Sequence, residues 1–145
     1  MLQLAFFKGR HPGLKGLFGQ AIKTWERGDY SHVEMIFSDG VCGSAVYWDG
    51  GVRLKSSIVF KDGDWDFVTL PDYLEAPARE WFETNKGKAY DFFGDVKIVL
   101  PFIKGSNDTF FCSRSVAASL GIDDTGRYEP NVLASAVKIF NRKAP

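Results

Sequence analysis

The sequence predicts an α+β fold in which an antiparallel β-sheet packs against helices. Short strand-like segments follow one another through the first half of the chain, and turn-forming pairs such as Asp39-Gly40 and Asp49-Gly50 separate them. Helix-like patterns stand before and after this series. A chain of 145 residues that is 45% hydrophobic can fill one core but not two, so we expect a single domain over residues 1–145.

The strands are predicted from apolar segments bounded by turn residues. Residues 3–7 form the first strand and end at a loop that contains glycine and proline. The segment SHVEMIF, residues 31–37, should fold back on VCGSAVYW, residues 41–48, because the Asp-Gly pair between them accepts the positive φ of a hairpin turn. Strands over residues 52–60 and 65–70 follow later turns. We expect these last four segments to form an antiparallel meander.

Helices are predicted where apolar residues recur every three or four positions. Residues 17–25 have this spacing before Gly28, and residues 74–86 have it before Gly87. A short helix is expected around residues 94–100, and a last one is expected near the C-terminus. The order of strand, helix, several strands and then helices is typical of an α+β protein.

Cys112 lies where a strand-like run, residues 109–111, changes to a helix-like run, residues 113–121. The free N–H groups and the positive dipole end at a helix N-terminus favour the thiolate, the form of cysteine that attacks carbonyl carbon. Of the two histidines, His32 opens a predicted strand, whereas His11 lies in a Gly-Arg-His-Pro-Gly loop. Cys112 and His32 are therefore a candidate nucleophile and base, and ordinary core packing is the alternative interpretation.

The charge balance and the two cysteines limit the classes of partner. Eighteen basic and eighteen acidic residues give a formal net charge of zero, which argues against binding to nucleic acid or to an anionic membrane. The N-terminal apolar run is too short for a signal peptide, and no stretch approaches the ~20 apolar residues of a membrane span, so we expect a cytoplasmic protein. Cys42 and Cys112 are then expected as free thiols, and no spacing indicates a metal or cofactor site.

Three segments, taken in order, resemble a known family: GDYSHVE at residues 28–34, GKAYDFFG at residues 87–94, and FFCS at residues 110–113. They are similar to the circularly permuted NlpC-type papain-like cysteine hydrolases, the branch that includes YiiX-like proteins and lecithin:retinol acyltransferase. In that branch the histidine strand precedes the nucleophile helix. The resemblance implies a permuted papain-like fold and a thiol-dependent hydrolase, of amidase or peptidase type, for the amide or ester of a small acyl or peptide-like substrate.

The resemblance also implies roles for individual residues. Cys112 matches the nucleophile and His32 the general base. Ser44, on the next strand, matches the polar residue that orients the histidine. A hairpin turn centred near Ser38 would place Ser44 across from His32, whereas a turn shifted by one residue would place it across from Glu34.

Other positions either line the site of the family or depart from its pattern. Tyr90, in a Gly-x-x-Tyr-Asp motif, matches a tyrosine that lines the site. Many relatives use a carboxylate, an amide or a second histidine where this chain has Ser44, so Glu34, which shares the strand parity of the histidine, is a second candidate orienting residue or a substrate contact. Arg114 follows Ser113 where relatives often have glutamate, and both residues are expected near the substrate. An acyltransferase and a non-catalytic binding or structural module are the alternative functions.

Overall fold

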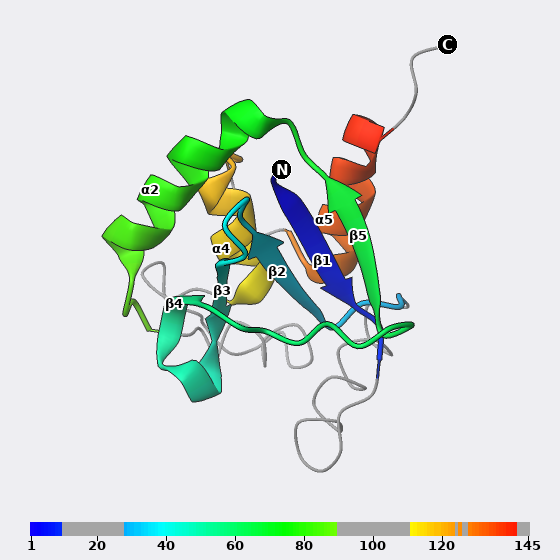
Figure 1. The fold of residues 1–145 in the computed structure, drawn as a ribbon, viewed down its shortest axis with the longest axis horizontal. Helices are drawn as coiled ribbons and strands as arrows, with labels where there is room; N and C mark the ends of the chain where they lie inside the picture. Colours follow the sequence, from blue (N-terminus) through cyan, green and yellow to red (C-terminus); the bar gives the residue numbers. More distant parts are fainter. Residues whose placement is uncertain (10–27, 90–110, 124, 126–127, 142–145) are drawn as a thin grey trace, which may run out of the picture.

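The computed structural model describes residues 1–9, 28–89, 111–123, 125 and 128–141, and it confirms the α+β class. Within these residues an antiparallel sheet of five strands packs against three α-helices (Figure 1). In chain order the strands and helices are β1 (Gln3–Phe7), β2 (His32–Ile36), β3 (Cys42–Val46), β4 (Gly51–Lys55), β5 (Trp65–Thr69), α2 (Glu75–Asn85), α4 (Cys112–Ser119) and α5 (Pro130–Val137). Short 3₁₀ turns occur at Tyr47–Asp49, Asp72–Leu74 and Lys138–Asn141.

The strand order is β4-β3-β2-β1-β5, so the predicted meander is correct for β2, β3 and β4 but wrong for the last strand. β5 pairs with β1, for example through Phe7 and Trp65, and β1 also pairs with β2. β1 fits between two strands because Leu4, Ala5 and Phe6 are all buried, which covers both of its faces with other residues. This internal position of β1, between β2 and β5, could not be predicted from local turn signals.

The β4 strand is shorter than the sequence predicts. It ends at Lys55, and the predicted continuation to residue 60 is irregular. Ser57 has a φ of 63°, a conformation that side-chain-bearing residues rarely adopt and that an extended strand cannot contain. The chain leaves the sheet edge there and returns at Trp65 to pair on the opposite edge.

The β2–β3 hairpin is confirmed, but its turn is centred one residue later than expected. The Phe37 N–H donates to the Val41 carbonyl at 2.9 Å and closes a three-residue loop over residues 38–40. Gly40 takes the left-handed position of this loop, with a φ of 80°. The centre of the turn is therefore Asp39, and the resulting register pairs Met35 with Gly43.

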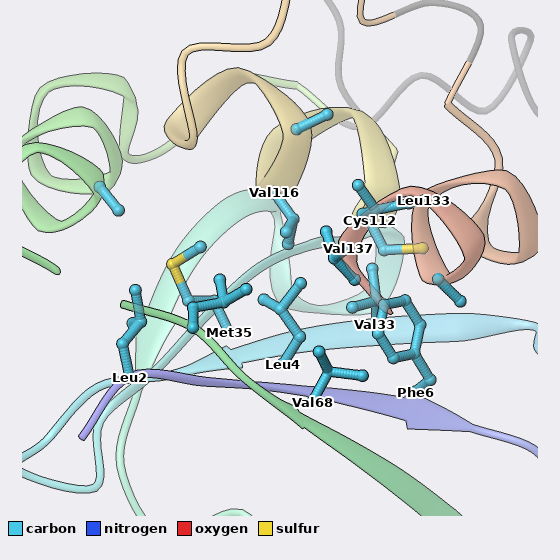
Figure 2. Packing of buried hydrophobic residues seen from close by; sticks show 14 of the residues in the cluster. Leu2, Leu4, Phe6, Val33, Met35, Val68, Cys112, Val116, Leu133 and Val137 are labelled. Atoms are coloured by element: carbon cyan, nitrogen blue, oxygen red, sulfur yellow. The ribbon is translucent and has the colours of Figure 1, made fainter. Parts of the chain in front are cut away.

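The hydrophobic core lies between the sheet and the helices (Figure 2). α4 packs against β2 and β3, and α5 packs against α4. The sheet, the residue before β1 and these two helices contribute the buried side chains Leu2, Leu4, Phe6, Val33, Met35, Val68, Val116, Leu133 and Val137. Because this packing holds α4 against β2, it also determines where the first residue of α4 lies.

The helix predicted over residues 74–86 is confirmed as α2, and Gly87 ends it with a φ of 84°. Ala78 and Phe82 face the core, and Trp81 is partly buried beside them. None of the described helices is long and apolar enough to cross a bilayer. The helices predicted over residues 17–25 and 94–100 lie outside the described residues.

Substitution of Gly43 by alanine should destabilise the fold, because a Cβ atom on Gly43 would lie 2.8 Å from ring carbons of the buried Phe82. Overpacking of this kind costs about 1–3 kcal/mol, and urea unfolding of Gly43→Ala should show a loss of that size. In a Phe82→Leu background the same substitution should cost less, since the smaller side chain leaves space. An equal cost in both backgrounds would contradict the contact.

Candidate active site

Cys112 is the first residue of α4, as the sequence predicts. Phe111 precedes it in an extended conformation, and its side chain does not cap the N–H groups of the first helical turn. The helix is established at once, since the Ser115 N–H donates to the Phe111 carbonyl at 3.0 Å. Cys112 is a free thiol, is 5% exposed and belongs to the core cluster (Figure 2).

His32 begins β2 and pairs with Phe7 of β1. The β2–β3 ladder covers only Met35 and Ile36, so the described residues do not pair β3 with the His32 end of β2. The imidazole is 24% exposed, and the Trp65 ring stands edge-on to it at a centroid distance of 6.4 Å. Trp65 reaches this place because His32, Phe7 and Trp65 are successive partners across three strands.

The imidazole of His32 interacts with both Cys112 and Glu34. Its Nε2 lies 2.8 Å from Glu34 Oε1, which leaves Nδ1 as the ring nitrogen for the thiol. Burial alone would lower the pKa of His32, but the charge of Cys112 and a hydrogen bond to it, together with those of Glu34, raise the pKa to about 10. The site therefore favours a protonated imidazole.

Glu34 hydrogen-bonds to Nε2 of His32. Its side chain is 3% exposed, and it accepts hydrogen bonds from His32 and twice from Arg53, at 2.8 Å and 2.5 Å. Burial alone would raise the pKa of Glu34, but these two partners lower it below its ordinary value. An ionised carboxylate only accepts hydrogen bonds, so Nε2 of His32 carries a proton.

Ser44 does not lie across from His32, and that expectation is wrong. The turn centred at Asp39 shifts the register, so that Ser44 lies level with Glu34 and pairs with Arg53 on its other side. Its hydroxyl donates to the Val33 carbonyl at 2.8 Å, where the β2–β3 ladder has ended. The alternative in which Ser44 faces Glu34 is the one that the geometry supports.

Within its described residues, the structure does not show the other predicted residues hydrogen-bonded to His32 or Glu34. Tyr90 is outside the described residues. Ser113 is fully buried on α4, and among the described residues its Oγ has no hydrogen-bond partner. Arg114 Nε donates to Thr125 Oγ1 at 3.4 Å. Cys42 is a free, buried thiol whose pKa is raised to about 11 by burial, followed by the charge of Glu34.

The segment before His32 is anchored to distant parts of the chain. The Asn131 amide of α5 bonds both the N–H and the carbonyl of Tyr30, each at 3.0 Å. The Tyr30 hydroxyl donates to Asp66 at 2.7 Å, and burial together with this bond raises the pKa of Tyr30 to about 12. These contacts hold the start of β2 in place.

Three residues near the site were not predicted from the sequence, and these are Arg53, Asp49 and Trp65. Arg53 Nε also donates to Asp49 Oδ2 at 3.1 Å, so both ends of its guanidinium are held. A signal for Arg53 existed, since an arginine inside a short apolar strand after Asp49-Gly50 has the register to face Ser44. Trp65 had no such signal, because its place depends on the unexpected pairing of β5 with β1.

The described site thus joins a thiol, an imidazole and a carboxylate, a combination suited to nucleophilic attack on an acyl group. Among the described residues, no group of three or more His, Cys, Asp or Glu side chains could hold a metal ion. Comparison of the sequence with protein-family models and with curated proteins found no match. The function is therefore inferred from the site geometry.

The imidazole of His32 should titrate near pH 10 in NMR spectra of the wild type, because Cys112 and Glu34 stabilise its protonated form. Removal of the thiol in Cys112→Ala takes away the largest effect that raises this pKa, so the midpoint should fall toward 6.5. The His11→Gln variant assigns the signals. A midpoint that is the same with and without Cys112 would contradict the contact.

Glu34→Gln should slow alkylation of Cys112 at neutral pH more than Ser44→Ala does. Glu34 bonds to His32 directly, whereas Ser44 bonds to the Val33 backbone. A hydrogen bond to a charged group contributes about 1.5–3 kcal/mol, which corresponds to a slowing of about tenfold or more. Circular dichroism checks that both variants fold. A larger effect of Ser44→Ala would show that the orienting residue is Ser44.

Proposed function

We propose that this protein is a thiol-dependent acyl hydrolase, of amidase or peptidase type, with Cys112 as nucleophile and His32 as general base. The observation that carries the proposal is the interaction of His32 with Cys112 on one side and with Glu34 on the other. A buried cysteine of purely structural role has no need of an oriented, charged imidazole.

In the proposed reaction, the proton of Cys112 has already passed to His32, and the thiolate attacks the carbonyl carbon of an amide or ester. The carbonyl oxygen becomes an oxyanion, which the N–H groups at the start of α4 can stabilise. The imidazolium of His32 then protonates the leaving amine or alcohol, and a thioester on Cys112 remains. His32 next withdraws a proton from water, which attacks the thioester and releases the acid. Attack by another acceptor instead of water would make the protein an acyltransferase.

Glu34 takes the orienting role in this proposal. It accepts a hydrogen bond from Nε2 of His32 and so turns Nδ1 toward Cys112. A carboxylate in this position also stabilises the imidazolium that forms when the thiol loses its proton. The role predicted for Ser44 therefore passes to a residue on the histidine strand itself.

The proposal includes the permuted papain-like fold. The histidine strand β2 precedes the nucleophile helix α4 in the chain, and α4 packs against β2 and β3. Both features agree with the resemblance of the sequence to the permuted branch. A small acyl or peptide-like substrate and a cytoplasmic location belong to the same proposal.

A non-catalytic binding module is the second candidate function. The burial of Cys112, which is 5% exposed, favours it, because a substrate carbonyl must reach the sulfur. The two candidates differ in the reactivity of the thiol. A small alkylating agent is the appropriate probe, since it needs little access.

Iodoacetamide should modify Cys112 at pH 7 at least about tenfold faster than Cys42, because His32 can take the proton of Cys112, whereas burial and the charge of Glu34 raise the pKa of Cys42 to about 11. Peptide mapping by mass spectrometry separates the two sites. His32→Gln should remove the difference, and Cys42→Ala, the matched control, should keep it. Equal and slow labelling of the two thiols in the wild type would support the binding module.

A screen of peptide amides, lipid esters and thioesters identifies the acyl group. For any substrate that is turned over, Cys112→Ala should lower the rate by roughly a thousandfold or more. Cys42→Ala should retain the wild-type rate. Hydrolysis that is unchanged in Cys112→Ala would end the hydrolase proposal.

A further inference from the structure

Arg53 reaches the candidate active site from β4, two strands away from His32. It pairs with Ser44 in the β3–β4 ladder, and its guanidinium extends over Ser44 to Glu34 on β2. Its Nη1 bonds Glu34 Oε2 and its Nη2 bonds Glu34 Oε1, so the two planar groups face each other in a two-bond contact. The Arg53 side chain is 10% exposed, so water competes little for this contact.

A carboxylate buried beside a single imidazole has two stable arrangements. The proton can stay on the imidazole as an ion pair, or it can pass to the carboxylate and leave two neutral groups. Only the first arrangement orients and charges His32. Arg53 remains charged at all relevant pH values, so its contact favours the ionised carboxylate and hence the ion pair.

The titratable and charged groups around Glu34 come from β2, β3 and β4. His32 lies on the same strand, Arg53 on β4 and the Cys42 thiol on β3, while β1 places the uncharged Ala5 opposite Glu34. Cys112 of α4 acts through His32. Asp49 holds the Nε of Arg53 at 3.1 Å, and Lys55 contacts Asp49 at 3.2 Å. Arg53 is thus the permanent positive charge that contacts the carboxylate directly.

We propose that Arg53 is a positioning residue of the thiol site, which keeps Glu34 ionised and fixes the plane of its carboxylate. Glu34 then accepts a hydrogen bond from Nε2 of His32 without taking the proton. The inference rests on the function proposed above and extends it from three residues to four. Stability alone gives little reason for this ion pair, because replacement of buried ion pairs by apolar residues is often neutral or stabilising.

The test measures the rate of Cys112 alkylation by iodoacetamide between pH 5 and 9 in three variants. Arg53→Met removes the charge and keeps a long apolar side chain, and Arg53→Lys keeps the charge without the two-bond geometry. Arg79→Met is the matched control, because Arg79 also forms an ion pair with an aspartate, Asp39, on a different part of the molecule. Circular dichroism and urea unfolding report whether each variant folds.

In Arg53→Met, Glu34 should take up a proton at higher pH than in the wild type, because the nearest permanent positive charge is gone. The acidic limb of the rate profile should move to higher pH by about one unit, which is about tenfold in rate on that limb. Arg53→Lys should show a smaller shift in the same direction, and it replaces Arg53→Met if that variant does not fold. Arg79→Met should match the wild type.

The outcomes separate this inference from the proposed function. Slow, His32-independent labelling of Cys112 in the wild type would overturn the function itself. Fast labelling in the wild type with the same pH profile in folded Arg53→Met would overturn the role of Arg53 and leave the function intact. A rate lowered equally at every pH, with unchanged NMR titration of His32, would show that Arg53 is only structural and would also overturn the inference.

Discussion

A buried carboxylate held between two positive groups is the interaction on which the candidate site depends. Glu34 is almost fully removed from water, and an isolated charge there would be very costly. Arg53 and His32 provide the compensating charges and hydrogen bonds. Because Arg53 compensates the charge of Glu34, the carboxylate can also accept a hydrogen bond from the imidazole, which in turn interacts with Cys112. Charge compensation therefore connects the edge of the sheet to the start of α4.

The backbone makes this interaction possible through the register of two hairpins. The turn that ends at Gly40 pairs Met35 with Gly43, and the turn that ends at Gly50 pairs Ser44 with Arg53. The two registers place Glu34 and Arg53 level with each other across β3, with the small Ser44 between them. A shift by one residue in either hairpin would send one side chain to the opposite face of the sheet and separate the charges.

Several parts of the fold and site were predictable because they depend on neighbours in sequence. The helix at Cys112, the helix before Gly87 and the β2–β3 hairpin follow from local spacing and turn residues. The predictions failed where distant segments decide. β5 joined β1 instead of β4, and β4 ended at Lys55, shortly before Ser57, whose positive φ no sequence pattern indicated. Glu34 was identified as one of two candidate orienting residues, but the choice required a register known to within one residue.

The sequence by itself determined the types of element and the helix start at Cys112, because propensity and periodicity act over a few residues. It also named Cys112 and His32 as a candidate pair. Only the tertiary structure decided that Glu34 rather than Ser44 bonds to His32 and that Arg53 completes the contact. The physical reason is that side chains along a strand alternate between the two faces of the sheet. A turn shifted by one residue therefore changes which side chains of neighbouring strands lie on the same face. Packing of the whole sheet against α4 then brings the selected face and the thiol together.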